Sequence, residues 1–191
     1  MRLVRFGEAG AEKPGIVDRQ GKIRDLSAHI TDLSGENLSP ASLDKIRALD
    51  LDALPLAPEG ERLGPPVAGT RTFIAIGLNY ADHAKETGQE IPKEPILFNK
   101  AATCICGPFD DVMYPRDSDR MDWECEIAFV IGTRARYVDA KDAIRYIAGY
   151  TICNDVSERR FQMKRNGQWV KGKSAETFGP LGPWLVTPDE I

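Results

Sequence analysis

The sequence has little of what secreted, membrane-spanning or nucleic-acid-binding proteins need. Its 191 residues include two histidines and four cysteines, and 25 basic against 29 acidic residues give a formal net charge of −4. An acidic chain without a Lys/Arg stripe does not attract nucleic acid. No apolar run approaches the ~18 residues of a membrane helix, and the start lacks a signal-peptide stretch. We expect a cytoplasmic protein with neither nucleic-acid nor membrane partners.

The four cysteines do not form a zinc or disulfide pattern. Cys104 and Cys106 lie two residues apart, Cys125 and Cys153 stand in apolar runs, and no C-x-x-C pair occurs. A chain of this length can bury a core large enough to need no cross-links. We therefore expect all four to be small buried hydrophobic residues.

The pattern of strands and turns predicts a small N-terminal unit. Residues 2–6, 15–17 and 22–24 read as short strands, and Ser39-Pro40 begins a short helix with Ser39 as N-cap. The prolines and glycines of residues 54–66 then predict a linker. We expect a small domain with its linker over residues 1–66 and a main domain from residue 67 to 191.

The main unit is predicted to be mostly β with short helices, an α+β fold. Strands are expected over residues 72–77, 95–98, 123–131, 149–153 and 184–186, and helices over 80–86 and 139–146, with Asp139 as a cap. The first of these strands reads as buried, and the last has no partner among the residues that follow it. In the strand at 123–131, the alternation predicts a buried face of Trp123, Cys125, Ile127, Phe129 and Ile131.

Three carboxylates stand where strands could bring them together. Glu124 and Glu126 share one face of their strand, and Asp155 follows the strand at 149–153. Neighbouring carboxylates repel each other unless they are solvated or share a cation, and a hard cation such as Mg²⁺, Mn²⁺ or Ca²⁺ suits oxygen ligands. An exposed strand face for the glutamates, and a helix cap for Asp155, are the alternatives.

Other residues could supply bases or positive charge. His83 and Glu86 lie three residues apart on a predicted helical turn, a spacing that suits either water activation or an ordinary surface pair. Lys173 is flanked by Gly172 and small residues, so its backbone could approach an anion closely. Lys100, after the strand at 95–98, is a weaker candidate of the same kind.

Taken together, residues 72–191 resemble the fumarylacetoacetate hydrolase family. Six segments occur in the family's order and spacing: Ile76-Gly77-Leu78-Asn79-Tyr80-Ala81-Asp82-His83, Asp122-Trp123-Glu124-Cys125-Glu126, Ala148-Gly149-Tyr150, Asn154-Asp155-Val156-Ser157-Glu158-Arg159, Gly172-Lys173-Ser174 and Phe178-Gly179-Pro180-Leu181-Gly182-Pro183-Trp184. The N-terminal residues are similar to the small domain of the family's bacterial sugar-acid and acylpyruvate branch.

The resemblance implies a mixed β-sandwich/roll core, a homodimer and one divalent cation, Mg²⁺ first, in each subunit. The family's metal ligands fall on Glu124, Glu126 and Asp155, and its water-activating pair on His83 and Glu86. Positions that contact substrate fall on Arg159, Gln162 and Lys173. Family members continue well beyond the position of Ile191, so we expect the C-terminal part of the catalytic domain, with its remaining strands, to be absent from this sequence.

The implied reaction is hydrolysis of a carbon–carbon bond in a 2,4-diketo acid to pyruvate and a carboxylic acid. Candidate substrates are a 2,4-diketo-3-deoxy sugar acid, from rhamnonate or fuconate breakdown, and an acylpyruvate. Tautomerase or decarboxylase activity on hydroxy-dienedioates, oxaloacetate decarboxylation and ureidoglycolate cleavage are rivals within the family. A catalytically silent binding or assembly protein is the alternative outside the enzymes.

Overall fold

The part of the chain that the structure describes contains twelve strands and four α-helices. The structure is a computed structural model that covers every residue except Thr87 and Gln89 and gives the backbone, but not the side chain, of His83. The strands are β1 (Arg2–Phe6), β2 (Lys13–Val17), β3 (Ile23–Asp25), β4 (Leu63–Gly64), β5 (Phe73–Gly77), β6 (Ile96–Lys100), β7 (Ile105–Cys106), β8 (Met121–Asp122), β9 (Cys125–Ile131), β10 (Ile147–Asn154), β11 (Ser157–Glu158) and β12 (Gly179–Val186). The helices are α1 (Pro40–Arg47), α2 (Ala81–Glu86), α3 (Arg159–Lys164) and α4 (Val170–Lys173). The prediction of a mostly β fold with short helices is confirmed.

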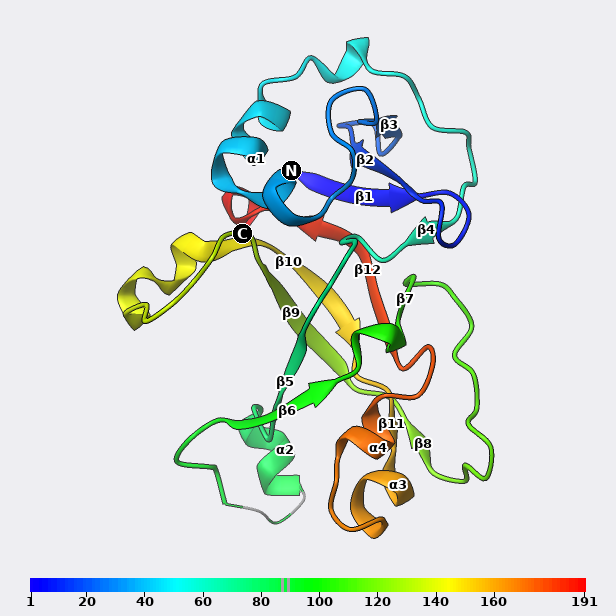
Figure 1. Cartoon of the computed structure of the whole chain (residues 1–191), viewed down its shortest axis with the longest axis vertical. Coiled ribbons are helices and arrows are strands. Elements are labelled where there is room, and N and C mark those ends of the chain that lie inside the picture. Colours follow the sequence, from blue (N-terminus) through cyan, green and yellow to red (C-terminus); the bar gives the residue numbers. More distant parts are fainter. Residues whose placement is uncertain (87, 89) are drawn as a thin grey trace.

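The three strands and the short helix predicted near the N-terminus form (Figure 1). β1 pairs antiparallel with β2, and β2 with β3. The turn between β2 and β3 closes because the Asp18 carboxylate accepts from the backbone N–H groups of Gln20 and Lys22, each at 2.9 Å. At the start of α1, the Ser39 hydroxyl accepts from the N–H of Ser42 at 3.4 Å, and Pro40 takes the first helical position.

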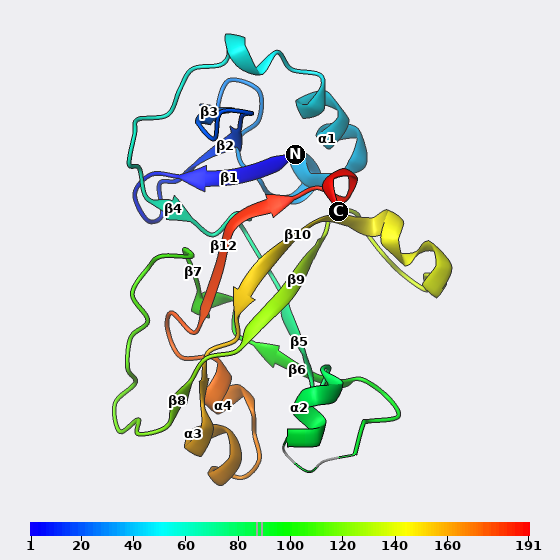
Figure 2. The same ribbon diagram turned by 180° about the vertical axis from the view of Figure 1, so that it is seen from behind.

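One long sheet joins the two ends of the chain. Over the described residues its order is β3-β2-β1-β12-β10-β9, with β4 added on β1 and β7 on β12. β12 lies between β1 and β10, where Leu3 faces Leu185. The strand predicted at 184–186 is thus paired on both sides, by strands that precede it in the sequence. Figure 2 shows the two termini close together at this sheet, where the N-terminal amine lies 2.7 Å from Glu190 Oε1.

The main core lies under the N-terminal strands. It consists of buried aliphatic residues from β1, β2, β10, β12 and the segment between β3 and β5: Leu3, Ile16, Leu26, Leu33, Leu38, Leu43, Ile46, Leu54, Val67, Ala148 and Leu185. A smaller cluster, Cys104, Val156 and Phe178, lies between β7 and the end of β10. The predicted linker at 54–66 packs against this unit, since β4 pairs with β1 and Leu56 bridges to Arg24.

The predicted buried face of β9 is exposed. Ile127, Phe129 and Ile131 are 67%, 58% and 51% exposed, and Trp123 and Cys125 are also exposed. The opposite face, which carries Glu126, Ala128 and Val130, is the half-buried one. Alternation defines the two faces of a strand, but only the rest of the structure determines which one is covered.

Three other predictions are corrected. β5 is a strand, but Ile74 and Ile76 on it are exposed rather than buried. The helix at 139–146 is a 3₁₀ segment, and the Asp139 side chain does not cap it. Three of the four free cysteines are buried as expected, and Cys125 is not. None of the described helices is long and apolar enough to span a bilayer.

Candidate active site

The paired ends of β9 and β10 bring two of the predicted carboxylates together. The strands are antiparallel, and Asn154 lies opposite Cys125. Just beyond, the N–H of Asp155 donates to the carbonyl oxygen of Glu124 at 2.9 Å. The side-chain oxygen of Asn154 accepts from the N–H of Glu124 at 3.1 Å. Glu124 and Asp155 thus become neighbours through sheet pairing, as the strand-end reasoning predicts.

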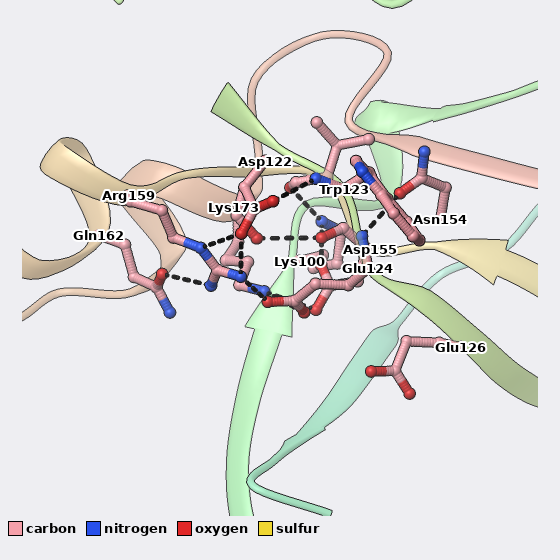
Figure 3. Close-up of polar contacts among 12 residues, drawn as sticks. Lys100, Asp122, Trp123, Glu124, Glu126, Asn154, Asp155, Arg159, Gln162 and Lys173 are labelled. Carbon is pink, nitrogen blue, oxygen red and sulfur yellow. Dashed lines mark hydrogen bonds and ion pairs between the residues drawn. The ribbon is translucent and has the colours of Figure 1, made fainter. Parts of the chain in front are cut away.

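Two lysines form ion pairs with the Asp155 carboxylate, one with each of its oxygens (Figure 3). Lys100 Nζ lies 2.5 Å from Oδ1 and also donates to the Val156 carbonyl at 3.2 Å, while Lys173 Nζ lies 2.8 Å from Oδ2. The Lys100 side chain is fully buried. Burial alone would raise the pKa of Asp155, but the charges of Lys100 and Lys173 outweigh it and hold the pKa below its usual value. Asp155 is therefore an ion-paired carboxylate, and the helix-cap alternative is wrong.

Lys173 links Asp155 to Glu124. Its ammonium lies 2.8 Å from Glu124 Oε2 as well, and 5.3 Å from the centre of the Phe98 ring. The position of α4 depends on Gly172, where a Cβ atom would lie 2.4 Å from the Glu158 carbonyl oxygen and 2.5 Å from the Gln162 nitrogen. The glycine beside Lys173 thus permits α4 to pack on α3.

Arg159 and Gln162 on α3 complete the network. The Arg159 guanidinium donates to Asp122 Oδ2 from Nε at 2.9 Å and from Nη2 at 2.8 Å, and it forms an ion pair with Glu124. Its Nη1 donates to Gln162 Oε1 at 3.1 Å. Although burial would lower the pKa of Arg159, the hydrogen bond to Asp122 and the charge of Glu124 raise it. The structure thus connects Glu124, Asp155, Lys173, Arg159 and Gln162.

Glu126 lies beside this network and is not drawn into it by any described contact (Figure 3). Its Oε2 accepts from Asn79 Nδ2 at 3.2 Å. Burial raises the pKa of Glu126, and the negative charges of Glu124 and Asp155 add to that effect. Glu126 is therefore close enough to Glu124 and Asp155 for their charges to act on it, although only those two are paired with described cations.

The water-activating pair is only partly described. α2 carries both predicted residues, and Glu86 is exposed at its last position. The side chain of His83 lies outside the described part of the structure. Asn79, two residues before α2, contacts Glu126, so the start of this segment lies beside the carboxylates.

The donor set fits a hard divalent cation by its chemistry. Carboxylate oxygens are the ligands that Mg²⁺, Mn²⁺ and Ca²⁺ prefer, and Glu126 offers one that no described cation contacts. As placed, no three His, Cys, Asp or Glu side chains among those described converge as a ready metal cluster. The three-carboxylate ligand set of Glu124, Glu126 and Asp155 therefore stays a prediction.

Three network residues were not assigned a site role from the sequence, or only a weak one. Lys100 ends β6, and its placement at the end of an apolar strand was a signal for a buried charge. Asp122, which orients Arg159, and Asn154, which orients Glu124, both lie inside the quoted motifs. Neither could be assigned, because their partners come from other elements.

Comparison with known proteins agrees with this β-rich fold. The family model described as "Fumarylacetoacetate (FAA) hydrolase C-terminal" matches residues 72–191. A protein of Burkholderia ambifaria named "Putative hydrolase" is 53% identical over all 191 residues, which span 68% of that relative. A solved fumarylacetoacetate hydrolase from Exiguobacterium antarcticum superposes with a TM-score of 0.80 at 32% identity, covering 100% of this chain and 68% of that one. A 5-carboxymethyl-2-hydroxymuconate delta-isomerase from Mycobacterium smegmatis gives 0.75 at 32% identity, covering 98% and 67%.

The family model and these relatives define a hydrolase-like enzyme. The chain belongs to the fumarylacetoacetate hydrolase family. Enzymes of this family generally use a divalent metal ion.

Proposed function

We propose that the protein hydrolyses a carbon–carbon bond of a 2,4-diketo acid in a Mg²⁺-dependent reaction that yields pyruvate and a carboxylic acid. The observation that carries the proposal is the Glu124–Lys173–Asp155 cluster, with Arg159 and Gln162 beside it, in a member of this family. The substrate we favour is a 2,4-diketo-3-deoxy sugar acid or an acylpyruvate. In the reaction, water supplies a hydroxyl group to C4 and a proton to C3 as the C3–C4 bond breaks.

A divalent ion held by Glu124, Glu126 and Asp155 would act as a Lewis acid toward the oxygens of the keto acid. The remaining roles belong to the chain itself. The ammonium of Lys173, already placed between two carboxylates, would balance the negative charge of the substrate carboxylate. Arg159 and Gln162 offer donors to the substrate's other oxygens.

His83 and Glu86 would prepare the attacking water. A carboxylate near an imidazole raises the basicity of the ring, which then accepts a proton from water at neutral pH. The short distance along the chain from Asn79, which contacts Glu126, to α2 supports this placement. The family resemblance also supports a homodimer and a cytoplasmic location as parts of the proposal.

A second candidate is isomerisation of a hydroxy-dienedioate. It is favoured by the names of structural neighbours, among them the M. smegmatis delta-isomerase and a 2-hydroxyhepta-2,4-diene-1,7-dioate isomerase from Mycobacterium marinum. Such a reaction moves a proton and needs no attacking water. The two candidates therefore differ in their dependence on a water-activating base.

The proposal is tested by mixing the protein with Mg²⁺ and acetylpyruvate and following loss of diketone absorbance together with pyruvate formation. We expect turnover to require Mg²⁺ and to be abolished in Glu124→Gln. The matched control is Glu59→Gln, which changes an exposed carboxylate in the 54–66 segment. Pyruvate formation that is indifferent to Mg²⁺ or to Glu124→Gln would contradict the proposal.

The His83→Ala variant separates the two candidates. General-base assistance is typically worth ~10²–10⁴-fold, so we expect hydrolysis to fall by that factor while keto–enol exchange of the same substrate falls much less. Deuterium exchange at C3, followed by NMR, measures the second process. Hydrolysis at the wild-type rate would place His83 outside the reaction.

A further inference from the structure

Trp169, the residue directly before α4, packs against the hairpin of β5 and β6. Its six-membered ring lies over Gly77, where a Cβ atom would stand 2.6 Å from Cζ3 and 3.1 Å from Cη2. The same side chain contacts the Phe98 ring edge-on, with the ring centres 5.3 Å apart. Gly77 and Phe98 share one face of the hairpin, because Phe98 pairs with Ala75 and alternate residues lie on the same face. The missing side chain of Gly77 therefore makes room for the indole ring.

The same helix carries Lys173, four residues after Trp169. Residues four apart lie on one side of a helix, and both of these side chains accordingly contact Phe98. The Lys173 ammonium also lies 2.8 Å from oxygens of Glu124 and Asp155. One side of α4 thus contacts both the β5–β6 hairpin and the carboxylates of the site.

The chain turns sharply just after Gly77. Leu78 has a φ of 50°, in the left-handed region, which a leucine adopts only where its surroundings hold it there. The next residue, Asn79, donates to Glu126 Oε2 at 3.2 Å, and α2 begins at Ala81, beyond the end of β5 (Figure 1). The contact that holds the end of β5 therefore determines the direction in which the chain continues into α2.

We propose that Trp169 is a positioning residue, which fixes the end of β5 against α4 and thereby sets the place of α2 beside the carboxylates. The inference rests on the proposed function, in which His83 and Glu86 on α2 activate water. A displacement of about 1 Å can lower a rate by about 10²-fold, so loss of this contact should slow hydrolysis strongly. Keto–enol exchange needs no attacking water and should depend on the contact much less.

The test is a pair of substitutions that compensate for each other. Trp169→Phe removes the outer ring atoms that lie over Gly77, and Gly77→Ala adds a methyl group that collides with them. We expect each single variant to lower kcat for acetylpyruvate hydrolysis by at least about tenfold, with keto–enol exchange within about threefold of wild type. In the double variant the added methyl group fills the space that the smaller ring leaves. Its kcat should therefore return to within about threefold of wild type.

Amide hydrogen exchange gives a second readout, which needs no substrate. The amides of residues 78–86 should exchange at least about tenfold faster in each single variant and return to the wild-type rate in the double variant. The control is Trp184→Phe, which changes a half-buried tryptophan of β12 that lies beside Arg2. It should alter neither measurement.

Additive losses in the double variant would overturn the inference, because they would show that Trp169 and Gly77 act separately. An equal fall of hydrolysis and keto–enol exchange in the single variants would also overturn it, since that is the effect of a general loss of structure. If the wild-type protein forms no pyruvate, the proposed function fails and amide exchange alone decides. Recovery of slow exchange in the double variant then upholds the contact between Trp169 and Gly77 as the one that fixes the α2 segment, and no recovery overturns it.

Discussion

Two charged clusters in this molecule are built from similar numbers of ion pairs but with different cations. The arginine cluster, Arg5, Glu12, Asp32, Arg62 and Asp110, joins β1 to the segments beside it. Each guanidinium donates hydrogen bonds from two nitrogens to one aspartate. The distances are 2.7 and 3.0 Å from Arg5 to Asp32, and 2.7 and 2.5 Å from Arg62 to Asp110. Glu12 connects the two arginines.

The lysine cluster, Lys100, Lys173, Glu124 and Asp155, has no such forked contacts. Each ammonium is a point charge that lies between two oxygens from different groups. A forked guanidinium fixes both oxygens of a carboxylate, whereas an ammonium leaves the carboxylate geometry adaptable. The comparison teaches that the arginine cluster is suited to holding segments of the fold together. The lysine cluster is suited to the proposed site for a cation and an anionic substrate.

Lys100→Met tests the lysine cluster, and we expect it to have the largest effect on the free energy of unfolding. The variant leaves the buried Asp155 carboxylate with one cation instead of two, and breaking a buried pair costs about 3–5 kcal/mol. We expect a loss of that size in urea denaturation. Lys93→Met, at an exposed position, should change the free energy of unfolding by less than about 0.5 kcal/mol. Equal effects of the two substitutions would show that Lys100 does not support Asp155.

Arg62→Met tests the arginine cluster. It removes charged hydrogen bonds to Asp110 and Glu12, and because Arg62 is 30% exposed we expect a smaller loss of about 2 kcal/mol. The affinity for Mg²⁺ should stay at the wild-type level, since none of the proposed metal ligands belongs to this cluster. Arg116→Met, an exposed arginine, serves as the control. A drop in metal affinity in Arg62→Met without a loss of stability would reverse the assignment of the two clusters.

The smallest expected effect is on how the free energy of unfolding changes with pH in the arginine cluster. The hydrogen bonds from Arg62 lower the pKa of Asp110 below its ordinary value of 3.8. A carboxylate whose pKa is lower in the folded state stabilises the protein fully above the ordinary value, and the contribution is lost as the pH falls through the folded value. As the pH falls below about 3.8, Arg62→Met should therefore lose less stability than wild type. Parallel curves of unfolding free energy against pH would contradict this.

Local patterns predicted the elements well and their burial less well. Ser39-Pro40 specifies the start of α1, and the alternation at 125–131 specifies β9, because the signals lie within a few residues of each other. The covered face of β9 depends on what packs against the sheet, and a strand's own sequence does not contain that information. Phe129 therefore lies in a strand, as predicted, but its face of the strand is exposed and not buried.

The candidate site shows the same limit. The strand-end position of Asp155 predicted its place beside Glu124, since sheet pairing follows from the strands themselves. The contribution of Lys100 could be suspected but not assigned, because its ammonium meets Asp155 only when β6 approaches the end of β10. The arginine cluster went unpredicted for the same reason, since Arg62 and Asp110 are 48 residues apart.

Calorimetric titration with Mg²⁺ tests the central claim, that the two carboxylates of the lysine cluster and the neighbouring Glu126 form the metal site. Glu126→Gln is the sharpest variant, because Glu126 makes no described contact with Lys100 or Lys173 and its loss leaves their ion pairs in place. The matched variant in the arginine cluster is Glu12→Gln. We predict that Glu126→Gln lowers the affinity for Mg²⁺ by about tenfold or more, and that Glu12→Gln leaves it unchanged. Wild-type affinity in Glu126→Gln, or an equal loss in Glu12→Gln, would contradict the claim.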